Sequence, residues 1–376
     1  MSNRNHPRAA EDILPGHPDR ICDAIAEQIV AIAHKWDAEA LVGVEVALHR
    51  NVVYLTGRVA AGSQGRDSGF PPPINIEDMQ LESVVSKQFE SAGYRGIWQH
   101  KVRVETDLDV GGLIEGEREI RRFSDDQGMA VGYADPDGIN HLPLEVAAAR
   151  RVKRALAGAR DAHSELLGPD GKVLVRLTPG QRPALEHVNI SIQHTAGLGF
   201  EDLYRLVLPY LTAAFDDLAT HLELPAIRGE SFRLNGIGDF TCGGPMGDNG
   251  LSGKKLVVDH YGPHVPIGGG AICGKDAHKP DRVGALRARQ VACRAANATG
   301  MPATVHLGYL PGLEAPDRLW VEFANGEMWS RERTEAHITV PDMTLAGTAH
   351  DLELAGQDWP SVMRHGYMGN NWRWDS

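Results

Sequence analysis

The sequence has few cysteines and no long hydrophobic run, and each shortage excludes a class of protein. Its four cysteines show neither a CxxC pair nor the histidine spacing of a zinc site, so a disulfide scaffold and structural zinc are not expected. No stretch reaches about 18 apolar residues, which excludes a membrane-spanning helix. The first residues lack the apolar segment of a signal peptide. We therefore expect a cytoplasmic protein with reduced thiols and no membrane partner.

Positive charge is also in short supply. The 38 Lys and Arg residues face 50 Asp and Glu residues, and the formal net charge of -12 argues against nucleic acid as the main partner. An anionic small molecule remains possible, because basic residues cluster locally. A chain of 376 residues is too long for one ordinary core, which favours two or three subdomains.

The order of helix-like and strand-like segments predicts an α+β protein. Helices are expected over residues 18–36, 76–91, 143–160 and 201–221, from residue 281, and over 351–365. Strands are expected over 41–48, 52–59, 97–105, 172–177, 187–193, 255–259, 303–309 and 318–323. Helix–strand–strand–helix recurs about three times, which favours three similar subdomains. The mixed-charge segment 105–126 is expected to be a long loop that acts as a lid.

The densest chemistry lies in residues 235–282, where two glycine-rich segments alternate with lysines and aspartates. Glycine lets backbone N–H groups approach a ligand, and aspartate can hold a divalent cation. Residues 268–276, GGGAICGKD, contain the GxxxxGK pattern, but Asp276 stands where a P-loop needs Ser or Thr, and Pro280 follows too soon. The lysines form two pairs beside glycines: Lys254 with Lys255, and Lys275 with Lys279. This pattern predicts a polyphosphate site with a cation beside it.

Three smaller motifs leave alternatives open. In GHPDR, residues 16–20, His17 and Arg20 could bind a phosphate at a helix N-terminus and Asp19 could bind Mg²⁺, although capping explains the pentapeptide better when it is taken alone. DDQG at residues 125–128 reads alone as a turn. Glu45, within LVGVEVAL, is either a solvent-facing strand residue or a buried cation ligand.

Taken together and in this order, the segments resemble the methionine adenosyltransferases (S-adenosylmethionine synthetases). The resemblance rests on HPDR, DDQG, GGPMGD, GLSGKK, GGGAICGKD, KPDR and the tail RHGYMGNNWRWD; it is dense in residues 16–25 and 235–282 and thin elsewhere. It implies an α+β fold of three similar α/β subdomains with pseudo-threefold symmetry. The expected limits are 1–104, 127–236 and 237–376, with a gating loop at 105–126.

The resemblance also implies a reaction. The sulfur of methionine attacks C5′ of ATP and expels tripolyphosphate, which is then hydrolysed to pyrophosphate and phosphate, with Mg²⁺ required and K⁺ usually helping. The enzyme is expected to be at least a homodimer, with a tetramer as the alternative, and to have active sites between subunits. A thioether has no proton to lose, so no general base is needed, whereas the leaving triphosphate needs concentrated positive charge.

Each matching residue acquires an expected role from the resemblance. The catalytic residues would be His17, Lys172, Lys275 and Asp281. ATP and its triphosphate would contact Arg20, Asp170, Phe240, Asp248, Lys254, Lys255 and Lys275. The acceptor would contact Arg58, Asp126 and Lys279. Mg²⁺ would be held by Asp19 and Asp281, and K⁺ by Glu45.

Two departures from the family pattern concern the acceptor. Arg58 stands where the family has a glutamate that binds the substrate ammonium, and residues 105–114, ETDLDVGGLI, lack the QSxDI motif of the gating loop. A cation beside an ammonium group is unfavourable. Glu105, Asp107 or Asp109 could substitute for the missing loop motif. For the glutamate, either the alignment shifts locally and another carboxylate takes its role, or the acceptor is not ordinary methionine. A triphosphatase or ATP hydrolase, and an inactive homologue that regulates an active subunit, are the alternatives from other classes.

Overall fold

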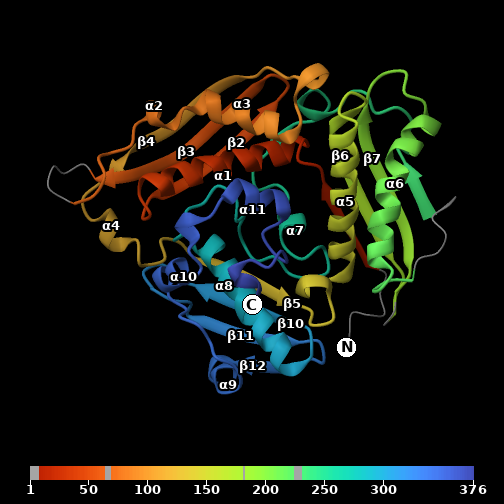
Figure 1. Cartoon of the computed structure of the whole chain (residues 1–376). Coiled ribbons are helices and arrows are strands. Elements are labelled where there is room, and N and C mark those ends of the chain that lie inside the picture. The colour runs from red at the N-terminus through yellow and green to blue at the C-terminus, as the bar shows by residue number, and fades with distance from the viewer. Residues whose placement is uncertain (1–7, 64–68, 181–182, 224–230) are drawn as a thin grey trace.

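Three four-stranded β-sheets, each packed against helices, make up the fold (Figure 1). The computed structural model describes residues 8–63, 69–180, 183–223 and 231–376. The apolar side chains of all three units join in one connected core, which includes Ile25, Val175 and Leu307. The expected α+β fold of three similar units is confirmed.

The first sheet has the strand order β4 (Arg103–Leu113), β3 (Val52–Ser63), β2 (Leu41–His49) and β9 (Gly250–Leu251). Helix α1 (Pro18–Trp36) packs on it together with α3 (Leu81–Ala92), and the short helices α2 (Ile76–Met79) and α4 (Glu117–Ile120) flank it. Pro18 occupies the first turn of α1, as expected for a residue without a free N–H. The apolar stripe of α1, Ile21, Ile25 and Ile29, is fully buried.

The second and third sheets repeat the scheme. The second has the order β1 (Arg8–Ile13), β6 (Leu167–Leu177), β7 (Leu185–His194) and β8 (Phe232–Leu234), with helices α5 (Leu144–Ala162) and α6 (Phe200–Leu218). The third has the order β12 (Met328–Ser330), β11 (Arg318–Phe323), β10 (Ala303–Tyr309) and β5 (Gly128–Ala134). Its helices are α8 (Pro280–Thr299), α9 (Arg331–His337), α10 (Leu345–Asp351) and α11 (Trp359–His365).

The sheets cross the chain limits expected from the sequence. Strand β1 joins the second sheet, β9 joins the first, and β5 pairs with β10 in the third, although residues 128–134 fall in the range expected for the central subdomain. Each exchange lets an edge strand pair its backbone N–H and C=O groups with a distant segment. Because the strands of each sheet come from separate parts of the chain, the sheets do not define where one subdomain ends along the chain. The expected limits remain a prediction.

Several segments differ from their expected secondary structure. The expected strand 97–105 begins only at Arg103, after a 3-10 turn at Gly96–Trp98, and the expected helix 351–365 is interrupted between α10 and α11. Residues 103–113 form strand β4 rather than a loop, and the expected lid continues into α4. Arg118 Nη2 and Nη1 pin α4 to Asp37 Oδ2 at 2.5 Å and to Glu39 Oε2 at 2.6 Å. Residues 256–259 form the short helix α7 (Leu256–Asp259), not a strand, and take no part in the third sheet. The valine pair in this segment suggested a strand, and tertiary packing overrode that preference.

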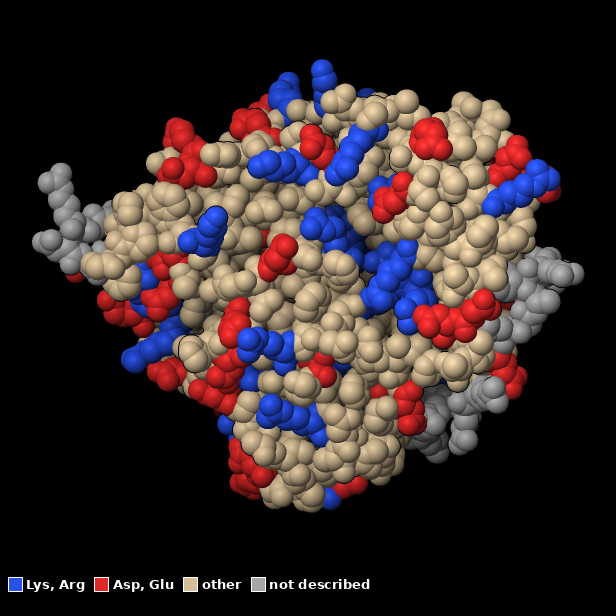
Figure 2. Space-filling model, in the orientation of Figure 1, with Lys and Arg blue, Asp and Glu red and all other residues tan. Residues whose placement is uncertain are grey.

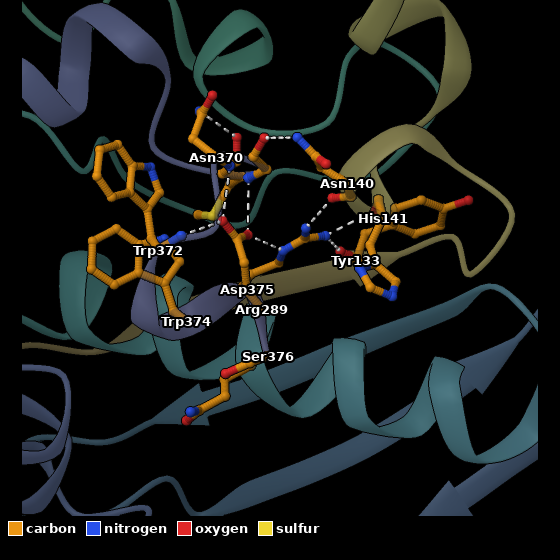
Figure 3. A network of polar contacts seen from close by, with 12 residues as sticks. Tyr133, Asn140, His141, Arg289, Asn370, Trp372, Trp374, Asp375 and Ser376 are labelled. Atoms are coloured by element: carbon orange, nitrogen blue, oxygen red, sulfur yellow. Dashed lines mark hydrogen bonds and ion pairs between the residues drawn. The ribbon is translucent and has the colours of Figure 1, made fainter.

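The C-terminal tail is tied into the core by a buried arginine (Figure 3). Arg289 on α8 donates from Nε to Asp375 Oδ1 at 2.9 Å and from Nη2 to the carbonyl oxygen of Asn140 at 2.8 Å. The second carboxylate oxygen of Asp375 accepts from the backbone N–H groups of Asn370 and Trp372, at 2.9 and 3.0 Å. The carboxylate of Asp375 therefore connects the C-terminal residues to helix α8 of the third unit.

A second set of cations holds the tail from the side of α5. Figure 2 shows Lys and Arg side chains gathered beside a hollow where Figure 1 places α5 and α11. Lys153 donates to the carbonyl oxygen of Arg364 at 3.2 Å, and Arg154 donates to Asn370 Oδ1 at 2.5 Å. Arg150 donates to the carbonyl oxygen of Met368. Within the described residues, no helix is both long and apolar enough to cross a bilayer.

Candidate active site

His17 caps the N-terminus of α1, and its ring is buried. Nδ1 accepts a hydrogen bond from the backbone N–H of Asp19 at 3.2 Å, which places the ring proton on Nε2. Nε2 has no partner among the described residues. Burial, followed by the positive charge of Lys172, lowers the pKa of His17 to about 3. The imidazole is therefore neutral near pH 7 and offers one N–H donor to a ligand.

Asp19 meets the lysine pair of the GLSGKK segment at the same helix end. Its Oδ1 accepts from the backbone N–H of Leu251 at 3.0 Å, and Lys255 Nζ lies 3.1 Å from Oδ2. Lys254 Nζ lies 3.7 Å from Oδ1. Two cations and a helix N-terminus converge on one buried carboxylate, an arrangement suited to a bound anion with a metal ion beside it.

Asp170 extends this group on strand β6. Its Oδ2 accepts from the backbone N–H of Gly244 at 2.8 Å, while Oδ1 has no partner in the described part of the chain. Gly244 has a φ of 63°, and the hydroxyl of Tyr94 lies 2.0 Å from where a Cβ would stand, so this turn requires glycine. Burial raises the pKa of Asp170 to about 6. The free oxygen is available to a ligand hydroxyl.

Lys172, Asp248 and Phe240 border the same group. Lys172 Nζ lies 4.0 Å from Asp248 Oδ2, and both side chains are about half exposed. Phe240 donates its backbone N–H to His194 Nε2 at 3.1 Å and accepts from the backbone N–H of His194 at 3.0 Å. This pairing holds the half-buried phenyl ring at the end of β7. We call His17, Asp19, Asp170, Lys172, Phe240, Asp248, Lys254 and Lys255 the first group.

Arg20, which is expected to contact phosphate, is buried and paired with carboxylates of the chain. Its Nη1 donates to Asp259 Oδ1 at 2.5 Å and to Asp23 Oδ2 at 3.1 Å. Burial opposes the charge, but Asp259 and Asp23 outweigh it and raise the pKa of Arg20. The guanidinium is therefore committed to two buried carboxylates and ties α1 to α7.

The second lysine pair forms a separate group around the start of α8. Lys275 Nζ contacts Asp281 Oδ2, and a Cβ on Gly270 would lie 2.3 Å from that oxygen, so the glycine-rich segment packs directly on the pair. Lys279 Nζ contacts Asp125 Oδ2. Asp126 is exposed and accepts from the backbone N–H of Gln127 at 2.7 Å. Asp125 rather than Asp126 thus faces the lysine expected to bind the acceptor.

Glu45 and Arg58 lie on the same face of the first sheet, next to this second group. Gly43 forms a β-bridge with Lys275 and pairs with Arg58 on β3, and Glu45 pairs with Thr56 one row away. Glu45 is exposed, as in the solvent-facing alternative.

The guanidinium of Arg58 is already engaged within the chain. It donates from Nη1 and Nη2 to the two oxygens of Glu117 at 2.6 and 3.0 Å. Asp109 Oδ2 lies 3.4 Å from its Nε. Two carboxylates therefore flank Arg58.

The carboxylates of both groups fit a metal ion that is completed by a ligand. The described residues contain no cluster of three or more His, Cys, Asp or Glu suited to a metal. Mg²⁺ in phosphate sites takes one or two carboxylates and fills its other positions with phosphate oxygens and water. Asp19 Oδ2 accepts no well-aligned hydrogen bond, which leaves a lone pair available. Asp19 and Asp281 could thus each hold Mg²⁺ once a polyphosphate is bound.

Several contacting residues were missed from the sequence. Tyr94 donates from its hydroxyl to the carbonyl oxygen of Gly16 at 2.8 Å and so supports the GHPDR turn. Arg121 binds Asp276 at 2.5 Å, next to Lys275. Glu117 neutralises Arg58. The two residues of each pair lie 59 to 155 residues apart along the chain, so no local motif predicts the contact.

The fold and the two groups define a class: an α+β enzyme of three units that handles a polyphosphate with lysines and carboxylates. Comparison with known proteins narrows it. Sequence models of the S-adenosylmethionine synthetase N-terminal, central and C-terminal domains match residues 6–110, 122–223 and 242–376. The chain belongs to the S-adenosylmethionine synthetase family, a family of transferases, and the resemblance inferred from its motifs is confirmed.

Individual relatives are distant but cover the chain. An S-adenosylmethionine synthase of Nocardia farcinica is 31% identical over 96% of this chain and 92% of its own length. One of Brachyspira hyodysenteriae is 28% identical over 97% and 94%. The solved structure of an unusual S-adenosylmethionine synthetase from Campylobacter jejuni superposes with a TM-score of 0.85 at 23% identity, covering 99% of this chain and 97% of that one, which shows the shared fold.

The pKa of Asp170 leads to a prediction about pH. Below pH 6 we expect ATP affinity to fall by about tenfold per pH unit, because the neutral acid is a weaker acceptor for a ligand hydroxyl and for the N–H of Gly244. Since the folded-state pKa is raised, ionisation of Asp170 costs stability, and this loss sets in as the pH rises from about 4 to 6. Equilibrium ATP titrations between pH 5 and 8 check the effect. An equally steep acid fall in Asp170→Asn would contradict it.

Proposed function

We propose that the protein transfers the adenosyl group of ATP to the sulfur of methionine or of a close thioether analogue. The sulfur lone pair attacks C5′, the C5′–O bond breaks, and tripolyphosphate leaves with the bonding electrons. Water then splits the tripolyphosphate into pyrophosphate and phosphate. The observation that carries the proposal is the meeting of Lys254 and Lys255 with Asp19 beside the neutral His17, in a chain of this family.

The residues of the two groups divide this work. His17 donates from Nε2 to an oxygen of the leaving phosphate or ribose, and the free oxygen of Asp170 accepts a ribose hydroxyl. Lys172, Lys254, Lys255 and Lys275 stabilise the charge that develops on the triphosphate. Phe240 stacks on adenine, with Asp248 near the ribose and Lys279 on the acceptor carboxylate. Bound to Asp19 and Asp281, Mg²⁺ would neutralise phosphate charge, and K⁺ would bind near Glu45. Cytoplasmic location belongs to the same proposal.

We infer a homodimer from the separation of the two groups. Within the described ranges, no hydrogen bond or ion pair joins a side chain of the first group to Lys275, Lys279 or Asp281. A triphosphate that needs both sets of cations would therefore lie between the first group of one subunit and the second group of its partner. A tetramer would be a pair of such dimers.

Mixing two inactive variants tests this arrangement. When His17→Ala and Lys275→Met dimers exchange subunits, half of the mixed population becomes heterodimers with one intact site of two, so about a quarter of wild-type activity should return. Activity is measured before and after exchange, and sedimentation confirms the dimer. A mixture of His17→Ala with Asp19→Asn, both in the first group, is the matched control and should stay inactive. Equal recovery in the two mixtures would refute a site shared between subunits.

The reaction itself is tested with a panel of thioethers. Purified protein is incubated with ATP, Mg²⁺, K⁺ and methionine or an analogue, and the products are followed by mass spectrometry. An adenosyl-sulfonium product supports the proposal and identifies the acceptor. Phosphate release without any sulfonium would replace it with the second candidate, a triphosphatase or ATP hydrolase, which the lysine groups alone would support.

A further inference from the structure

A buried polar cluster behind the second lysine group has no part in the proposed chemistry. It consists of Glu27 on α1, Arg282 on α8 and Tyr367 beyond α11, and each of these residues is 0% exposed. Arg282 Nη2 donates to the two oxygens of Glu27 at 2.8 and 2.6 Å. The hydroxyl of Tyr367 donates to Glu27 Oε1. A carboxylate at this depth depends on both donors.

Arg282 connects this cluster to the candidate site. It directly follows Asp281, and its Nε and Nη2 donate to the carbonyl oxygen of Ile272 at 3.2 and 3.0 Å. Ile272 lies in the glycine-rich segment that carries Lys275. One guanidinium therefore holds together the two chain segments that supply the Lys275–Asp281 pair.

The C-terminal tail, residues 359–376, supplies the remaining contacts. The ring of Trp359 lies under the Arg282 guanidinium, 3.9 Å from ring centroid to Cζ. Trp374 donates from Nε1 to the carbonyl oxygen of Tyr367 at 2.6 Å, and Asp375 anchors the end of the tail to Arg289 (Figure 3). The tail thus places the hydroxyl of Tyr367 on Glu27 and the ring of Trp359 against Arg282.

We propose that the C-terminal tail is a positioning element of the triphosphate site, in which Tyr367 acts through Glu27 and Arg282 on Lys275 and Asp281. The inference rests on the proposed function, because its ligand is the triphosphate with its Mg²⁺. Without the hydroxyl, Glu27 Oε1 loses one of its two donors in a low-dielectric interior, and the carboxylate that anchors Arg282 is held less firmly. The glycine-rich segment and the first turn of α8 are then no longer held at a fixed position relative to each other.

Tyr367→Phe tests the proposal without changing packing volume. We expect the Kd for Mg²⁺–tripolyphosphate, measured by calorimetry on the full-length protein, to rise about tenfold, together with the Mg²⁺ concentration for half-saturation. Tyr309→Phe is the matched control: this buried tyrosine also packs on α8, but its hydroxyl has no partner in the described structure. Its Kd should stay at the wild-type value.

The outcomes separate the inference from the proposed function. A Tyr367→Phe protein with a lower melting temperature but an unchanged Kd overturns the positioning role, even if the wild type forms a sulfonium. A raised Kd supports it, even if no thioether yields a sulfonium and the proposed function falls. Asp375→Asn, which loosens the tail at a distance, should raise the Kd in the same direction. If Tyr367→Phe fails to fold, an unchanged Kd in folded Asp375→Asn overturns the inference.

Discussion

Replacing Lys275 with methionine is expected to lower kcat for sulfonium formation roughly 1,000-fold, because a positioned donor to a developing anion contributes most in the transition state. Lys275 is held for this task by its contact with Asp281 and by its bridge to Gly43. Methionine keeps the length and much of the packing of the lysine stem while it removes the charge. Single-turnover assays with ATP and the acceptor measure the chemical step directly.

The loss should fall on kcat more than on KM for the acceptor, since the lysine is proposed to contact the leaving group. Lys87→Met on α3 is the matched control, because Lys87 is exposed and lies away from both groups. Its kcat should remain within about twofold of wild type, as for most surface substitutions. A Lys275→Met enzyme that retains a tenth of the wild-type kcat would show that this lysine does not stabilise the leaving triphosphate.

The parts of the fold that follow local rules could be predicted from the sequence. Helix α1 has Pro18 at its start and isoleucines on one face, and it runs over the predicted residues. The β2–β3 hairpin follows its turn at Arg50 and Asn51. The lysines and glycines of residues 235–282 also indicated polyphosphate chemistry correctly at the level of the family. In each case the deciding physics acts between neighbours in the chain.

The remaining features depend on contacts that no local pattern encodes. Strand β4 carries acidic residues on its exposed face and reads as a loop until β3 provides its parallel partner. Arg20 suits a phosphate by motif, yet Asp259, 239 residues away, binds it in the interior. The link from Tyr367 to Glu27 spans 340 residues. The sequence thus indicates which chemistry is present, while distant partners decide which charges remain free to perform it.

These distant partners matter most at Arg58, where the acceptor is expected to bind. The bidentate pair with Glu117 accounts for an arginine on this face without an anionic acceptor. Glu117 and Asp109 then represent the carboxylates that could replace the missing family glutamate. The pair is also an obstacle, because an ammonium group must compete with a fixed guanidinium for the same oxygens.

Arg58→Glu should therefore shift acceptor preference by on the order of 100-fold, measured as the ratio of kcat/KM for methionine to kcat/KM for a thioether with an extra acidic group. The substitution replaces a like charge beside the ammonium with an opposite one, and it removes a basic partner for the extra acidic group of an acidic acceptor. It also places a third carboxylate beside Glu117 and Asp109, so helix α4 should loosen and hydrogen exchange should rise in residues 114–121. Competition assays with both acceptors in one mixture give the ratio free of errors in enzyme concentration.

Arg103→Glu is the matched control for this experiment. Arg103 lies at the start of strand β4, which neighbours the strand β3 that carries Arg58, and it pairs with Glu105 at 2.7 Å, but its side chain is 69% exposed. Because exposed ion pairs contribute little, this charge reversal should leave the acceptor ratio within about threefold of wild type. An unchanged ratio in Arg58→Glu, with α4 still ordered, would mean that Arg58 only clasps Glu117 and that the acceptor is recognised elsewhere. A ratio that moves equally in both variants would assign the effect to the net charge of the sheet face rather than to Arg58.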